Sequence, residues 1–202
     1  MSSYVEPVHF NDLAVKDPGT VVQNTTAQYD SSTKSFILPV WGQTFEINPG
    51  VQTIIATDPH GFEPEGYVEL FILHYLINAQ STPLSQEWVS EKDIPGGAAF
   101  FRGPHTLPTI DIAQKFGEDV DGFKKTCTHF GGSHLSMADA AFVFDITPSI
   151  PVAVLLWLGD EDFGAESKLL FDKTIAGHLP LDIIYALAVM VCKTVCKHIG
   201  PA

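Results

Sequence analysis

The sequence predicts a single α+β domain in which a mainly antiparallel sheet packs against a buried central helix and a C-terminal helix. Val152–Leu158 is an unbroken apolar run, which is typical of a strand covered on both faces near the centre of a sheet. Glu65–Ala79 places apolar residues around almost the whole circumference of a helix, as buried helices do. Leu181–His198 follows Pro180 and precedes Gly200-Pro201, which predicts the closing helix.

A hairpin is predicted before the central helix. Phe36–Trp41 and Thr44–Asn48 flank Gly42-Gln43, a pair suited to a tight turn. Pro39 cannot donate a ladder hydrogen bond, so we expect its strand at a sheet edge. Val51–Ala56 adds a third short strand.

The ends of the chain differ in character. Residues 1–34 are polar and turn-rich, so we expect a peripheral segment there and one domain over residues 35–202. Two short helices are expected at Thr109–Phe116 and Val120–Phe130, each closed by glycine.

A short connection predicts how the strand before the central strand pairs with it. Ala140–Ile146 reads as a strand, and the five residues TPSIP join it to the central strand. That connection is too short for a parallel crossover, so the two strands should be antiparallel neighbours. Lys168–Asp172 fits a further strand or a helical turn equally well.

Composition excludes several classes of partner. The 202 residues are 45% hydrophobic and 17% charged, as in ordinary globular proteins. A net charge of -13 argues against nucleic acids and anionic membranes, which require a basic surface. We find no signal peptide and no apolar segment that could span a bilayer, so we expect a cytoplasmic protein. The oligomeric state stays open.

Several sequence blocks carry a family resemblance. They are LHYLINA (73–79), EWVSEKDIPGG (87–97), FFRG (100–103), AQKFG (113–117), DAAFVFDITPSIPV (139–152) and LLWLGDEDFGAESKLLFDKTIAGHLP (155–180). With these blocks the chain resembles the uncharacterised prokaryotic family known as domain of unknown function 3786.

The resemblance implies a setting rather than an activity. It points to anaerobic bacteria and archaea, and to relatives with an added iron–sulfur domain of the kind found in corrinoid proteins of one-carbon metabolism. The three cysteines of this chain lack close CxxC spacing and cannot ligate such a four-cysteine cluster.

His74, Tyr67 and Asn78 form a polar seam on the predicted central helix. A histidine on a buried helix either satisfies both ring nitrogens internally or offers one to a cofactor such as a haem iron or a corrinoid cobalt. Asn78 is one turn beyond His74 and could orient the ring. The simpler alternative is a core histidine that is hydrogen-bonded to backbone and to Asn78.

Arg102 is the one arginine of the chain and lies in a glycine-rich loop. Glycines let the backbone approach a ligand closely, and a guanidinium binds carboxylates or phosphates. The alternative is an ion pair with one of the 24 carboxylates.

Asp160 and Asp162 follow the central strand, and with His178 they are candidate ligands for a metal ion such as Mg²⁺ or Ca²⁺. The alternative is a solvated acidic turn. Cys192 and Cys196 are four residues apart on the last helix and read as soft-metal ligands or as core residues.

Three functional hypotheses follow. The first is a non-catalytic accessory protein that binds a cofactor or small ligand, or docks on a partner enzyme, through His74, Asn78, Tyr67 and Arg102. The second is a metal-dependent hydrolase or lyase centred on Asp160, Asp162 and His178. The third is a structural subunit of a larger complex.

Overall fold

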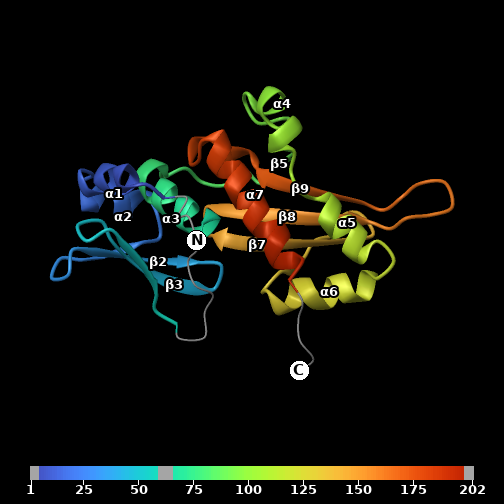
Figure 1. The fold of residues 1–202 in the computed structure, drawn as a ribbon, viewed down its shortest axis with the longest axis horizontal. Coiled ribbons are helices and arrows are strands. Elements are labelled where there is room, and N and C mark those ends of the chain that lie inside the picture. The colour runs from blue at the N-terminus through green and yellow to red at the C-terminus, as the bar shows by residue number, and fades with distance from the viewer. Residues whose placement is uncertain (1–4, 59–65, 198–202) are drawn as a thin grey trace. The chain divides into compact units, whose positions relative to one another are not determined.

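The computed structural model describes residues 5–58 and 66–197 of the chain. In these ranges it contains seven α-helices, short 3-10 turns and two antiparallel sheets (Figure 1), so the predicted α+β class is confirmed. The chain divides into two compact units. Unit 1 comprises Met1–Leu84, Ile146–Ser149 and Thr174–Leu187, and unit 2 comprises Ser85–Asp145, Ile150–Lys173 and Ala188–Ala202.

The sheet of unit 1 is a meander in the order β1-β2-β3-β4. Its strands are β1 (Gln28–Asp30), β2 (Ser35–Val40), β3 (Gln43–Asn48) and β4 (Thr53–Ala56). The predicted β2–β3 hairpin is confirmed, but its turn is Trp41-Gly42 rather than Gly42-Gln43. Both turn residues have positive φ angles, 46° and 74°, the left-handed pair that matches the twist of a two-residue hairpin.

The prediction that Pro39 marks an edge strand is wrong, because β2 pairs with β1 on one side and with β3 on the other. The short strand β1 pairs only with Ser35, Phe36 and Ile37 of β2. Pro39 lies beyond that ladder and is paired with Thr44 of β3. The proline therefore removes no hydrogen bond that β1 could have accepted.

Three helices belong to unit 1: α1 (Pro7–Ala14), α2 (Pro18–Asn24) and α3 (Tyr67–Asn78). The first two were not predicted, although Asp17-Pro18 is a typical N-cap and first-turn pair. Helix α1 packs against α3. Leu13 and Val21 are buried, while the division into a peripheral segment and a single domain stays a prediction.

Helix α3 confirms the predicted central helix, and the predicted start at Glu65 lies outside the described residues. The side chains that face the interior are Val68, Phe71, Ile72, Leu73, Tyr75 and Leu76, whereas the face with Leu70, His74 and Ile77 is half-buried. The closing helix α7 (Leu181–Val195) is also confirmed, and the predicted end at His198 lies outside the described residues. The boundary between the units falls within α7 and within the strand Ala140–Thr147.

The sheet of unit 2 has the order β5-β9-β8-β7-β6. Its strands are β5 (Trp88–Val89), β6 (Ser133–His134), β7 (Ala140–Thr147), β8 (Ile150–Trp157) and β9 (Glu166–Asp172). Strand β8 is central and buried from Ile150 to Leu156, as its apolar run predicts. Lys168–Asp172 is a strand, because β9 pairs with β8 from Glu166 to Phe171.

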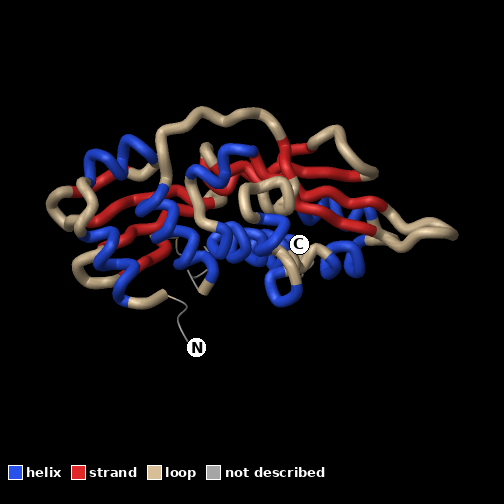
Figure 2. The backbone as a smooth tube through the Cα atoms, turned by 90° about the horizontal axis from the view of Figure 1, so that it is seen from above, coloured by secondary structure: helices blue, strands red, loops and turns tan. Residues whose placement is uncertain are grey.

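Short helices accompany this sheet: α4 (Gly97–Phe100), α5 (Ile110–Phe116), α6 (Val120–His129) and the 3-10 turn Gly103–His105. Helix α5 packs against β8 and β9, and so covers part of the sheet. The loop between β8 and β9 reaches past the ends of the strands (Figures 1 and 2) and carries the predicted acidic turn. Each helix within residues 5–58 and 66–197 is too short or too polar to cross a membrane.

Candidate functional site

His74 lies half-buried on α3 and is held by Asn78, one turn away. The Asn78 side chain donates a 2.9 Å hydrogen bond to the His74 carbonyl, and its Nδ2 lies 3.5 Å from His74 Nδ1. Burial and the neighbouring His9 lower the pKa of His74, whereas Asp182 and Asp12 act in the opposite direction. His74 is therefore a neutral imidazole at pH 7.

His9 on α1 is the partner that the sequence did not reveal. Its ring lies edge to face with that of His74, with centroids 4.9 Å apart. His9 Nδ1 accepts the backbone N–H of Glu6 at 3.2 Å and closes the N-terminus of α1. Tyr67 begins α3 two turns before His74, about 10 Å along the axis, so it is not a near neighbour of the imidazole.

Arg102 lies in unit 2, exposed, between α4 and the 3-10 turn. It forms no ion pair with any residue in the described ranges. His74 belongs to unit 1, so the two predicted binding residues are not brought into one unit.

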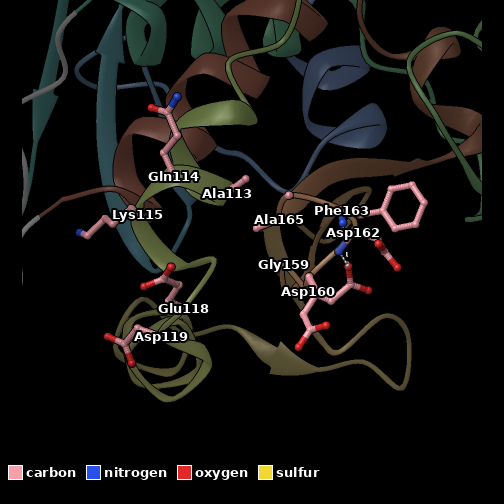
Figure 3. Close-up of a pocket in the computed structure, with 12 residues that line it drawn as sticks. Ala113, Gln114, Lys115, Glu118, Asp119, Gly159, Asp160, Asp162, Phe163 and Ala165 are labelled. Atoms are coloured by element: carbon pink, nitrogen blue, oxygen red, sulfur yellow. Dashed lines mark hydrogen bonds between the residues drawn. The ribbon is translucent and has the colours of Figure 1, made fainter.

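A groove of about 780 Å³ in unit 2 contains the predicted acidic turn (Figure 3). Its carboxylates come from the end of α5 and from the β8–β9 loop: Glu118, Asp119, Asp160, Glu161 and Asp162. Lys115 points away from the loop, since its ammonium donates to the Cys196 and Lys197 carbonyls at 2.9 Å each. Phe163 lies on the β8–β9 loop, on the opposite side of the groove from Lys115 (Figure 3), and is 75% exposed.

The acidic side chains of this groove support the local backbone. Asp160 Oδ1 accepts the N–H groups of Asp162 and Phe163 at 2.9 and 2.7 Å. Asp119 accepts the Gly122 N–H at 2.8 Å and so caps α6. These contacts are those of a hydrogen-bonded turn and a helix cap.

The predicted metal ligands are only partly brought together. Asp160 and Asp162 share one loop of unit 2, whereas His178 is buried in unit 1, where its Nδ1 accepts the Gln80 N–H at 3.4 Å. In the ranges that the structure describes, no three His, Cys, Asp or Glu side chains gather as a metal site. The metal site stays a prediction.

All three cysteines belong to unit 2: Cys127 lies in α6, Cys192 in α7, and Cys196 directly after the end of α7. Burial raises the pKa of the Cys192 thiol to about 12 and raises that of Cys127 as well. Cys196 is half-buried, and its pKa is raised by burial although Lys115 opposes the shift. All three thiols are protonated at neutral pH and are weak nucleophiles.

A recess that the sequence did not predict lies in unit 1, where the C-terminal end of α1 meets the β1–β2 and β3–β4 turns. Its volume is about 360 Å³. We call it the lysine recess, after Lys16 and Lys34, which line it. It is also lined by Leu13, Tyr29, Phe36, Asn48 and Val51.

The side-chain amide of Asn48 links the two turns that form the rim of the lysine recess. Asn48 Nδ2 donates to the Thr33 carbonyl of the β1–β2 turn at 2.9 Å. Asn48 Oδ1 accepts the N–H groups of Gly50 and Val51, at 3.0 and 3.2 Å, in its own turn. The sequence Asn48-Pro49-Gly50 signals a turn, but nothing local shows that its amide spans two turns.

A second recess in unit 1, also about 360 Å³, is lined by uncharged residues near Tyr75 and Ser149. The two hydroxyl oxygens lie 2.6 Å apart, so each satisfies the other.

No curated protein and no solved structure matches the chain. A family model does match residues 17–194, which include both central elements α3 and β8, and Lys34 of the lysine recess. The chain therefore belongs to the family described as domain of unknown function DUF3786.

Proposed function

We propose that the protein is a non-catalytic cytoplasmic accessory protein, and that it binds a small ligand in the lysine recess of unit 1. The observation that carries the proposal is the preformed apolar floor of the recess. Its accessible apolar surface comes from the half-buried Tyr29 ring and from Val51, which is 67% exposed. Leu13 and Phe36 are buried and support the recess from within, and the Tyr29 ring packs on Phe36 with centroids 4.9 Å apart. Concave sites with apolar walls and a few polar groups are the usual form of small-molecule sites.

The hydrogen-bonded rim of the lysine recess supports its role as a binding site. Because the Asn48 amide already holds both turns, a ligand would not have to order them. Preorganisation of this kind lowers the entropy lost on binding. A volume of about 360 Å³ lies at the small end of ligand sites, which favours a compact molecule.

The non-catalytic part of the proposal is supported by the chemistry of the thiols and of His74. The buried thiols are protonated, because their pKa values are raised. An axial role for His74 in a haem or corrinoid would require a proton on Nδ1. That atom faces the Asn78 amide nitrogen, itself a donor, which favours an unprotonated Nδ1 and disfavours this axial role.

The test is an NMR titration of isotope-labelled protein with benzoate and with benzyl alcohol. We expect saturable shifts at the amides of Lys34, Phe36 and Val51. Ala14→Trp should block the recess and abolish them, since Ala14 lines it. Ala98→Trp, at an exposed position in unit 2, is the matched control. Absent shifts, or shifts that survive Ala14→Trp, would contradict the proposal.

A further inference from the structure

We infer that the ligand of the lysine recess is a small organic anion, a carboxylate or phosphate monoester with a flat apolar body. This inference rests on the proposed function and names the class of its ligand. Two cations and no carboxylate line the recess. The groove beside the β8–β9 loop is instead lined by five carboxylates and one lysine, and the recess near Tyr75 has no charged residue.

The two lysines come from separate segments and reach one recess. Lys16 follows α1, and Lys34 ends the β1–β2 turn with a φ of 57°. Both are exposed, and neither forms an ion pair with a described residue. In a chain of net charge -13, such unpaired cations are where a local positive potential can arise.

The nearest carboxylates in sequence are held by their own turns. Asp17 Oδ2 accepts the N–H and the hydroxyl of Thr20 at 2.8 and 2.9 Å. Asp30 Oδ1 accepts the same two groups of Ser32 at 2.8 and 2.7 Å. These hydrogen bonds lower the pKa of both carboxyl groups and engage one oxygen of each. Among these described side chains, neither carboxylate forms an ion pair with Lys16 or Lys34.

The floor sets the shape of the rest of the ligand. The half-buried Tyr29 ring, which packs on Phe36, and the exposed Val51 side chain supply the apolar surface that a ligand can cover. The Tyr29 hydroxyl has no hydrogen-bond partner within residues 5–58 and 66–197, so it can donate to the anionic group. An anion without an apolar body would leave this floor in water, which makes a free inorganic ion the poorer fit.

Four probes of one shape test the charge preference by NMR titration: benzoate, phenyl phosphate, benzyl alcohol and benzylamine. We expect either anion to bind at least tenfold more tightly than benzyl alcohol, and benzylamine most weakly. Lys16→Met and Lys34→Met should each weaken the anions about fivefold, which is the factor for about 1 kcal/mol of Coulomb energy at contact in water. Both substitutions should leave benzyl alcohol unchanged.

Lys92→Met is the matched control, because Lys92 is an exposed lysine in unit 2. A Lys16→Glu, Lys34→Glu double variant should reverse the order of affinities, so that benzylamine binds more tightly than either anion. Equal binding of all four probes would overturn the inference and leave the proposed function standing. Binding of none of them would overturn the proposed function itself. Tighter binding of benzoate would indicate a carboxylate ligand, and tighter binding of phenyl phosphate would indicate a phosphate monoester.

Discussion

The imidazole rings of His9 and His74 lie edge to face, 4.9 Å apart, and so connect α1 to α3 in unit 1. Two protonated imidazoles at this distance would repel each other. The contact therefore depends on at least one ring being neutral. Helix α1 also supplies Leu13 to the floor of the lysine recess, so its docking on α3 bears on the proposed site.

The first prediction concerns stability at mildly acidic pH. The pKa of His74 is lowered from 6.5 in the folded chain, so the unfolded chain binds more protons between the two pKa values. The free energy of unfolding should therefore fall as the pH drops through 6.5, and level off below the folded pKa. His74→Gln should flatten this dependence in urea unfolding between pH 5 and 8. His134→Gln, at an exposed position, should leave it intact.

A second prediction isolates the histidine pair. His9→Gln removes the charge that opposes protonation of His74, while Asp12 and Asp182 still favour it. The pKa of His74 should rise, and carbon-13 NMR of the imidazole measures this directly. An unchanged or lower pKa would contradict the assigned role of His9.

Asp172 should be a major stabilising residue of unit 2. It is 4% exposed, and its carboxylate accepts the Ser85 N–H, the Ser85 hydroxyl and the Gln86 N–H at 3.1, 2.9 and 2.8 Å. Asp172→Asn replaces one acceptor oxygen by a donor, which should cost about 1–3 kcal/mol of unfolding free energy in urea. Asp93→Asn is the control, since Asp93 makes similar bonds to Ser90 but is exposed. Equal losses for the two variants would argue against the role of Asp172.

Gly97 should not tolerate a side chain. A Cβ there would clash with the backbone oxygen of Glu91, which cannot move without the chain. We expect Gly97→Ala to lower the free energy of unfolding by about 1–3 kcal/mol, the usual range for overpacking. A Cβ at Gly177 would meet nothing within 4 Å, so Gly177→Ala should be neutral or slightly stabilising. Thermal unfolding of the two variants provides the comparison.

The cysteines should differ in reactivity with an aromatic disulfide reagent. Cys196 is half-buried and Lys115 favours its thiolate, whereas Cys127 and Cys192 are fully buried. One thiol should therefore react first in the folded protein, and Cys196→Ser should remove that phase. In urea all three should react together. A fast phase that persists in the Cys196→Ser variant would contradict this assignment.

Elements with one-sided or all-round apolar patterns were predictable. Val152–Leu158 corresponds to central strand β8, and Glu65–Ala79 to helix α3, because extensive burial requires an apolar composition that can be recognised in the sequence. Asn78 was likewise predictable as a neighbour of His74, since residues four apart share a helix face.

Other assignments depended on neighbours that are distant in sequence. Pro39 sits in an inner strand because β1 ends before reaching it. Lys168–Asp172 becomes a strand because β8 offers a ladder to pair with. A local pattern contains no information about which chain segment lies alongside it.

By itself, the sequence determined the α+β class, the family, the acidic character and the two buried central elements, because each follows from composition or from short-range periodicity. Tertiary structure decided that His9 meets His74, and that Lys16 and Lys34 line one recess. These pairs are brought together by the packing of α1 and by the Asn48 amide between two turns. Such contacts are long-range, and no spacing along the chain encodes them.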